Sequence, residues 1–410
     1  MDFNDSPEDA AYRAEVRSWL AANAPKSATG GSDLEGGGDS MGASKAWQAK
    51  KAAAGYAQIT WSKEWGGPGG TPIQQVIFNA EEGAYPVPPN PFAIGLGMCV
   101  PTVMTFADEA TKRRFVEPAL RGQEIWCQLF SEPSGGSDVA AARTKAVRAD
   151  DGSGDWIING QKVWTTGAHF SNFGIVVTRT DPDAPKHKGM TMFWVDMADP
   201  GIEARPIHQM SGGSGFNEVF FTNVRVPDTQ RLGEINDGWR VSLVTLMNER
   251  LAVGGPSGAG WRLFMDAARN VTGLDGAPAL KDQVVREKIA DWYVQTEGLR
   301  HIRNRTVTAL SRGQTPGPES SIGKVVVALQ QQDLANSAIE LLDQYGVISD
   351  PVIAPLQGAL QATLLGSPGL RIAGGTDEIL KNIIAERVLG LPGDIRVDKD
   401  VAFKDLPTGR

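Results

Sequence analysis

A glutamate inside a predicted helix, Glu249, is a candidate for acid–base chemistry in this sequence. It stands in the stretch LMNERL (246 to 251), which has apolar neighbours and is followed by the small residues AVGGPSGAG. Such a glutamate either pairs with an arginine on a solvated helix surface or points into a pocket roofed by glycines. A carboxylate in an apolar pocket has a raised pKa, and that suits a general base. The residues alone leave both interpretations open.

A loop rich in glycine and serine could bind an oxygen-rich ligand. It lies in WCQLFSEPSGGSDV (126 to 139), where residues 134 to 137 predict a tight turn with several free backbone N–H groups. Ser131 and Ser137 add hydroxyl groups to this turn. The alternative is an ordinary turn at the end of a strand, which is the commoner use of such a loop.

A tryptophan and two threonines stand together at a predicted strand end, in QKVWTT (161 to 166). Trp164 could stack on an aromatic heterocycle while the threonine hydroxyls bond to it. The alternative is a core tryptophan with threonines in ordinary strand positions. The segment 155 to 165 contains Asn159-Gly160, which predicts a hairpin that turns at those two residues.

A fourth stretch, IAGGTDEI (372 to 379), predicts a helix start. Two glycines lead into a threonine cap, Thr376, and acidic residues follow it. The exposed N–H groups of such a start can bind a carbonyl or phosphate oxygen. A capped helix without any ligand is the alternative.

The periodicity of apolar residues divides the chain into three regions around these stretches. Spacings of three and four predict helices from Ser6 to about Gly122, beginning at Ser6-Pro7-Glu8-Asp9, with a surface loop in the tract 27–44. A period of two predicts a β-domain, with strands at 174–180, 190–197, 202–207 and 217–226. Helices return at about 239–269, 280–312, 320–345 and 376–389, with a break at 366–375. We therefore expect an α+β protein with domains at 1–122, 123–228 and 229–410.

Composition narrows the class of protein. The 410 residues carry a formal net charge of −8, which argues against a general nucleic-acid binder. Cys99 and Cys127 stand in apolar stretches and predict buried thiols in a reduced cytoplasm. The acidic N-terminus is unlike a signal peptide, and the longest apolar run, 92–106, is too short to span a membrane. We expect a soluble cytoplasmic protein, and its histidines (His169, His187, His208 and His301) show no metal-ligand spacing.

The four stretches, in this order and at these distances, resemble the acyl-CoA dehydrogenase family. The closing run NIIAERVLGLP (382 to 392) is also typical, so the likeness covers nearly the whole chain. The resemblance implies a helical N-terminal domain, a middle β-domain and a C-terminal four-helix bundle, with FAD between the last two. It also implies α,β-desaturation of an acyl-CoA thioester, in which a carboxylate removes the α-proton and the flavin N5 accepts the β-hydride.

The resemblance further implies a role for individual positions. Ser137 would contact both cofactor and substrate, and Arg269 and Gln283 would reach the FAD of a neighbouring subunit, which implies a homodimer or homotetramer. The Gly374 N–H would bind the thioester oxygen. The other implied cofactor contacts are Leu129, Phe130, Ser131, Trp164, Thr165, Thr166, Thr376 and Glu378. The other implied substrate contacts are Leu246, Arg250 and Gly375. Electron-transfer flavoprotein is the implied electron acceptor.

The sequence departs from the commonest family pattern at position 374. Many members carry the catalytic glutamate there, and this chain has Gly374. A branch that includes the isovaleryl and long-chain enzymes supplies the base from the helix position of Glu249, so the resemblance assigns the base to Glu249. An acyl-CoA oxidase and a base-poor subunit of a heteromeric dehydrogenase are the alternatives. The acyl group, whether short, branched, long or polycyclic, stays open.

Overall fold

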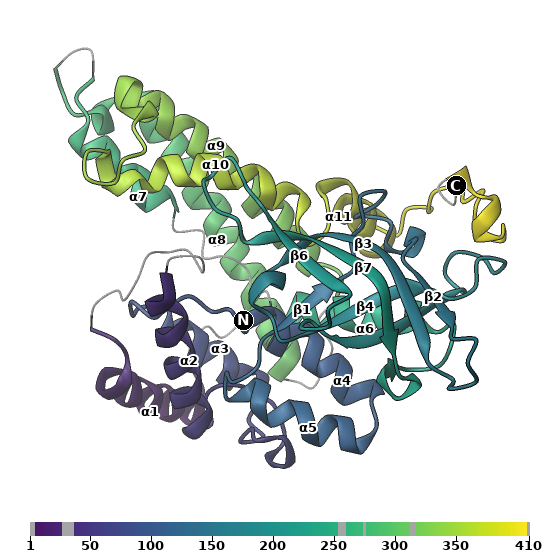
Figure 1. The fold of residues 1–410 in the computed structure, drawn as a ribbon. Coiled ribbons are helices and arrows are strands. Elements are labelled where there is room, and N and C mark those ends of the chain that lie inside the picture. Colours follow the sequence, from purple (N-terminus) through teal and green to yellow (C-terminus); the bar gives the residue numbers. More distant parts are fainter. Residues whose placement is uncertain (1–4, 27–36, 253–259, 274–275, 312–316, 408–410) are drawn as a thin grey trace. The chain divides into compact units, whose positions relative to one another are not determined.

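The computed structural model describes residues 5–26, 37–252, 260–273, 276–311 and 317–407. The chain forms two compact units, shown in Figure 1. The first unit comprises residues 1–252 together with the C-terminal segment 395–410, and the second comprises residues 253–394. No helix in the described part of the chain is long and apolar enough to cross a membrane.

The first unit begins with helices, as the sequence predicts. The hydroxyl of Ser6 accepts a hydrogen bond from the Asp9 N–H at 3.1 Å and caps the first helix, which confirms the predicted start. The expected loop at 27–44 is wrong for its second part, because residues 37–44 are helical; residues 27–36 lie outside the description. The Ser44 hydroxyl of this helix is buried and is satisfied by the carbonyls of Ser40 in the helix and Pro89 outside it. The helices are α1 (Pro7–Asn23), α2 (Gly37–Ala53), α3 (Pro72–Glu82), α4 (Val100–Phe106) and α5 (Glu109–Leu120).

An 8-stranded sheet follows, with the order β6-β7-β3-β2-β4-β5-β8 and β1 paired to β4. The four strands predicted by the period of two are confirmed as β4 to β7. The strands are β1 (Trp126–Leu129), β2 (Lys145–Arg148), β3 (Trp156–Thr166), β4 (Phe173–Arg179), β5 (Met190–Asp196), β6 (Ile202–Ile207), β7 (Phe216–Val226) and β8 (Arg231–Leu232). The helix α6 (Gly238–Ala252) completes the unit.

The predicted hairpin at Asn159-Gly160 is wrong, because both residues lie inside the continuous strand β3. The register of β3 against β7 shifts between Ile158 and Gly160, so the two residues form a bulge rather than a turn. A Cβ on Gly160 would lie 2.7 Å from the Cα of Thr144, so a glycine is needed where the neighbouring backbone comes close. The hairpin partner of β3 is β2, which the periodicity did not predict.

The second unit is helical. Its helices are α7 (Gly260–Asn270), α8 (Gln283–Ser311), α9 (Ser320–Leu342), α10 (Ala359–Ile372) and α11 (Asp377–Ile383). Phe264, Trp292 and Leu334 lie in its buried core. The predicted break at 366–375 is wrong for residues 366–372, because α10 continues to Ile372. Pro368 within α10 cannot donate a backbone bond, and the Ser367 hydroxyl donates to the Leu364 carbonyl at 3.1 Å instead.

The C-terminal segment (yellow in Figure 1) belongs to the first unit and contacts the loop 181–188. Phe403 is buried, and the guanidinium of Arg179 lies 3.9 Å from the centre of its ring. The Phe403 N–H donates to the Ala184 carbonyl at 2.9 Å. Lys186 binds Asp398 of the segment at 2.5 Å and Asp138 at 2.8 Å. The segment is therefore tied to the chain next to the glycine- and serine-rich loop.

Candidate active site

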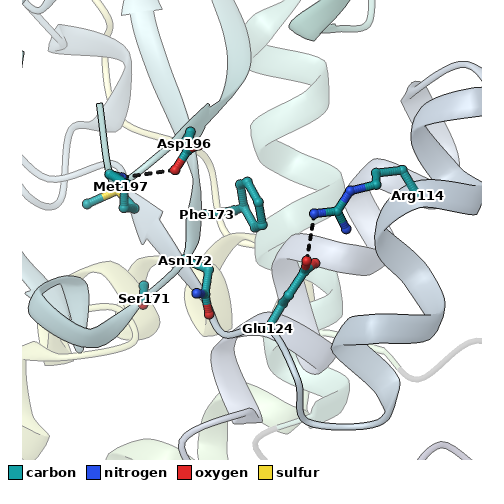
Figure 2. A pocket seen from close by; sticks show the side chains of 8 residues that line it. Arg114, Glu124, Ser171, Asn172, Phe173, Asp196 and Met197 are labelled. Atoms are coloured by element: carbon teal, nitrogen blue, oxygen red, sulfur yellow. Dashed lines mark hydrogen bonds and ion pairs between the residues drawn. The ribbon is translucent and has the colours of Figure 1, made fainter. Parts of the chain in front are cut away.

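A hollow of about 470 Å³ opens on the first unit, and Figure 2 shows its lining. Arg114 of α5 reaches over Phe173 and binds Glu124 at 2.7 Å. A second hollow of about 450 Å³ shares Arg114, Phe173 and Asp196 with the first. Neither lining contains a site residue that the sequence predicts, so these hollows do not mark the predicted chemistry.

The glycine- and serine-rich loop is held to β3 by a buried ion pair. Lys162 Nζ of β3 lies 2.7 Å from Glu132 Oε1 and donates to the Phe130 carbonyl at 3.1 Å. Glu132 also accepts from the N–H groups of Arg143 and Thr144, at 2.6 and 2.9 Å. Burial alone would raise the pKa of Glu132, but the Lys162 charge and these hydrogen bonds hold it below its ordinary value. Sequence reasoning missed this pair, because its members stand 30 residues apart.

The Lys162–Glu132 ion pair joins the glycine- and serine-rich loop to the QKVWTT strand. The Val163 N–H donates to the Ser131 carbonyl at 2.9 Å, so Ser131 lies beside the residue that precedes Trp164. Ser131 is half-buried and Ser137 is exposed, so both are accessible from solvent. Leu129 and Phe130, two of the cofactor contacts that the resemblance implies, are buried in the core.

Trp164 departs from ordinary strand geometry. Its φ of 58° lies in the left-handed region, which is rare for a bulky residue, and its side chain is 57% exposed. A core tryptophan, the alternative drawn from the sequence, is therefore excluded. Strain of this kind persists where the surroundings impose it, and it concentrates at functional sites. Its ring meets Phe216 edge-on, with 6.0 Å between ring centres.

The two threonines after Trp164 differ in environment. Thr165 is buried, and its Oγ1 has no hydrogen-bond partner among the described residues. Its carbonyl accepts from Asn217 Nδ2 at 2.9 Å, which fixes the backbone here. Thr166 is half-buried. An unsatisfied buried hydroxyl beside an exposed aromatic ring fits a flat, polar heterocycle such as the isoalloxazine of FAD.

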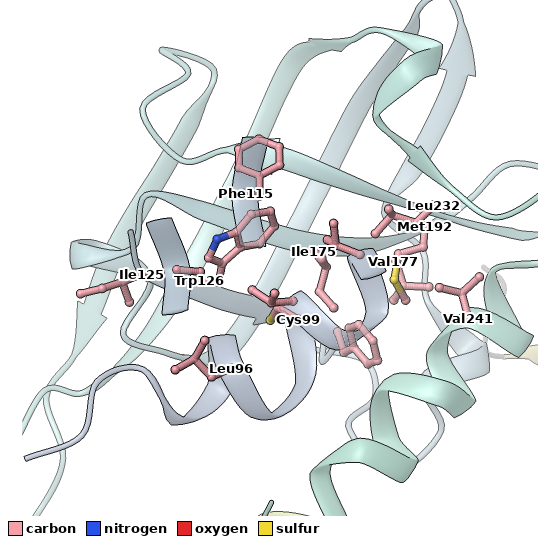
Figure 3. Close-up of a cluster of buried hydrophobic side chains, with 14 of the residues drawn as sticks. Leu96, Cys99, Phe115, Ile125, Trp126, Ile175, Val177, Met192, Leu232 and Val241 are labelled. Carbon is pink, nitrogen blue, oxygen red and sulfur yellow. The ribbon is translucent and has the colours of Figure 1, made fainter. Parts of the chain in front are cut away.

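The helix that carries Glu249 is fixed to the core of the first unit. Val241 of α6 packs among Met192, Leu232 and other core side chains, as Figure 3 shows. The Thr245 hydroxyl lies 2.9 Å from that of Thr102 in α4. Leu246 is half-buried against the same core. The side chains of Glu249 and Arg250 lie outside the described part of the structure.

In the second unit, the IAGGTDEI stretch forms a tight turn between α10 and α11. Gly374 and Gly375 have φ values of 64° and 94°, which favour glycine at both positions. The Thr376 hydroxyl accepts from the Ile379 N–H at 3.3 Å, which confirms the predicted cap. Glu378 is exposed in the first turn of α11.

Three charged residues surround this turn, and sequence reasoning missed them as a group. Lys324 of α9 donates to the Gly375 carbonyl at 2.6 Å. Arg371 of α10 binds Asp377 of α11 through its Nε and Nη2 atoms, at 2.6 and 2.5 Å. Asp377 is buried, and its Oδ1 lies 3.9 Å from Lys324 Nζ. In the sequence, only Asp377, the acidic residue directly after the threonine cap, indicated that charged residues gather here.

The remaining predicted cofactor contacts of the second unit make local pairs. Arg269, near the end of α7, binds Asp266 at 2.5 Å. Gln283, at the start of α8, donates to Glu287 at 2.8 Å. Both side chains are exposed.

Known proteins are similar to this chain over nearly its whole length. The family models for the acyl-CoA dehydrogenase N-terminal, middle and C-terminal domains match residues 6–123, 127–224 and 236–389. Acyl-CoA dehydrogenase IpdE1 of Mycobacterium tuberculosis is 33% identical over 396 residues, which cover 94% of this chain and 98% of that protein. Acyl-CoA dehydrogenase FadE34 of the same organism is 39% identical over 326 residues, which cover 80% of this chain and 43% of that longer protein.

Solved structures extend the likeness to the fold. The Tcur3481-Tcur3483 steroid ACAD has a TM-score of 0.79 and 25% identity, over 96% of this chain and 100% of that one. The ChsE4-ChsE5 complex from Mycobacterium tuberculosis has a TM-score of 0.78 and 26% identity, with the same coverage. The chain therefore belongs to the acyl-CoA dehydrogenase family, the FAD-dependent oxidoreductases that dehydrogenate acyl-CoA thioesters.

Proposed function

We propose that this protein introduces an α,β double bond into an acyl-CoA thioester, with Glu249 as the base. The complementary pair of Gly374 and Glu249 carries this proposal, because a family member without a glutamate at 374 needs its base elsewhere. The anchoring of α6 supports it. Thr245, on the same helix as Glu249, is fixed to the core.

Glu249 takes the α-proton as the α C–H bond breaks, and the electron pair forms the new double bond. The β-hydrogen leaves with its bonding electrons, and FAD, when bound, would supply the hydride acceptor. Negative charge develops on the thioester oxygen during proton removal, and the Gly374 N–H stabilises it. In the described part of the chain, no acceptor lies in hydrogen-bond geometry around that N–H, so it can serve a ligand oxygen.

The cofactor contacts follow from the first unit and from the family resemblance. The resemblance implies a contact at Thr165, and its buried Oγ1 has no hydrogen-bond partner among the described residues. Trp164 would cover the ring system with its exposed face. Arg269 and Gln283 are exposed and would reach the FAD of a second subunit, which makes the enzyme a homo-oligomer. Electron-transfer flavoprotein would reoxidise the flavin.

A polycyclic acyl group is the substrate class that we propose. The similar solved structure described as a steroid ACAD supports this choice. Gly374 is compatible with a polycyclic acyl group. With the base on α6, position 374 needs no side chain. A panel of short, branched, long and steroid-derived acyl-CoAs should show the strongest flavin bleaching with the steroid-derived compounds. Preference for short straight chains would contradict this assignment.

The second candidate function is a subunit of a heteromeric dehydrogenase. The ChsE4-ChsE5 complex, a structure of similar fold, favours this alternative. The purified chain separates the two functions. A yellow protein that is bleached anaerobically by acyl-CoA without any added protein is the predicted homo-oligomeric enzyme. A chain that is bleached only after a second, different chain is added supports the heteromer, and oxygen uptake during turnover would identify an oxidase.

A further inference from the structure

The turn that carries Gly374 has little stiffness of its own. Its two glycines have no side chains to restrict the backbone, and both have positive φ. A hydrogen bond from the Ala373 N–H to the Gly369 carbonyl, at 2.9 Å, fixes the end of α10. The Leu380 N–H donates to the Thr376 carbonyl at 3.0 Å and fixes the start of α11. The glycines between these points need another restraint if the Gly374 N–H is to keep one direction.

Lys324 supplies a restraint from a third helix. Its ammonium group donates to the Gly375 carbonyl at 2.6 Å, a short charge-assisted bond to the middle of the turn. The lysine is itself held, because the buried carboxylate of Asp377 lies 3.9 Å away. Burial lowers the pKa of Lys324, and the charge of Asp377 opposes that effect.

Arg371 keeps that carboxylate in place. Its guanidinium binds Asp377 Oδ2 through two nitrogens, and its Nη1 donates to Gln332 of α9 at 2.9 Å. Asp377 Oδ1 accepts no hydrogen bond from the described residues and faces Lys324. The ion pair thus joins the two helices that flank the turn, and Lys324 adds the direct contact to the turn's backbone.

We propose that Lys324 is a positioning residue for catalysis, which orients the Gly374–Gly375 turn so that its free N–H meets the thioester oxygen. The inference rests on the proposed function, because it assigns a purpose to the turn in that reaction. A donor that points away from the developing charge gives little stabilisation. Lys324 therefore acts on the rate of the proton and hydride transfers more than on the affinity for acyl-CoA.

The test compares FAD-loaded wild type with Lys324→Met and Lys324→Arg. Anaerobic flavin reduction is timed with the acyl-CoA that bleaches the wild type best. Binding affinity and the carbonyl stretch of an isotope-labelled thioester are measured with its unsaturated product. Lys288→Met is the matched control, because Lys288 also bonds to a side-chain oxygen on α9, Ser337. Ser337 lies 13 residues along α9 from Lys324, which is about 20 Å.

We expect Lys324→Met to reduce flavin about tenfold or more slowly, with product affinity changed by less than about threefold. Its thioester carbonyl stretch should shift towards the value in water, and Lys324→Arg should restore both readouts. The control should match the wild type. If Lys324→Met does not load with FAD, Lys324→Gln takes its place in the same measurements. If the Met or Gln variant reduces flavin at the wild-type rate and shows the wild-type carbonyl stretch, the inference is wrong. If no acyl-CoA bleaches the flavin of the wild type, the proposed function itself is wrong.

Discussion

Lys162 Nζ lies 2.7 Å from Glu132 Oε1, and both side chains are buried. The pair ties a loop to a strand, so that Ser131 lies beside Val163, the residue before Trp164. A buried ion pair adds little net stability compared with apolar packing, but it allows one geometry only. We infer that it sets the position of the loop, and the first two predictions test that inference.

Removal of one partner should destabilise the protein strongly. Lys162→Met leaves the Glu132 charge buried without compensation, which should lower the free energy of unfolding by about 3 kcal/mol. The double variant with Glu132→Gln should recover part of that loss. Denaturant unfolding measures all three proteins. Lys145→Met, at an exposed position of β2, is the control and should change stability by less than about 0.5 kcal/mol. Equal losses at positions 162 and 145 would refute the inference.

The same pair should make stability sensitive to acid. The folded-state pKa of Glu132 lies below its ordinary value of 4.5, so the unfolded chain binds the proton more readily. Its contribution is therefore fully present above pH 4.5 and is lost as the pH falls through the folded-state pKa. The difference in unfolding free energy between wild type and Glu132→Gln should narrow across that range. A difference that is constant with pH would mean that Glu132 keeps its ordinary pKa.

Thr165→Val should separate folding from cofactor binding. The variant removes a buried hydroxyl that has no partner among the described residues, so the FAD-free protein should be as stable as the wild type or more stable by up to about 1 kcal/mol. Affinity for FAD should fall about tenfold, because a hydrogen bond is lost. Flavin fluorescence titration gives the affinity. Unchanged affinity would remove Thr165 from the proposed site.

The C-terminal segment should protect the neighbouring loop of the first unit. Phe403→Ala removes a buried ring from beside Arg179, at a cost of about 3 kcal/mol to the docking of the segment. Amide hydrogen exchange should accelerate in residues 181–188, where Ala184 binds the segment. Lys399→Ala, at an exposed position of the same segment, is the control. Unchanged exchange in the Phe403 variant would show that the segment does not hold that loop.

Features set by local chemistry could be predicted from the sequence, and those set by distant contacts could not. The caps at Ser6 and Thr376 follow from side chains that bond three residues along, and both are confirmed. Asn159-Gly160 has the local preference for a turn, but the contact with Thr144 and the pairing with β7 keep it inside a strand. No local rule connects Lys324 with the Gly375 carbonyl, 51 residues away.

Glu249→Gln tests the central claim most directly. The variant keeps nearly the same shape and removes the negative charge, so it should bind FAD normally and reduce it several orders of magnitude more slowly when an acyl-CoA is added anaerobically. Glu297→Gln, on α8, is the control and should behave as the wild type. Flavin reduction at a near-normal rate in Glu249→Gln would contradict the account, because the base would then be another residue.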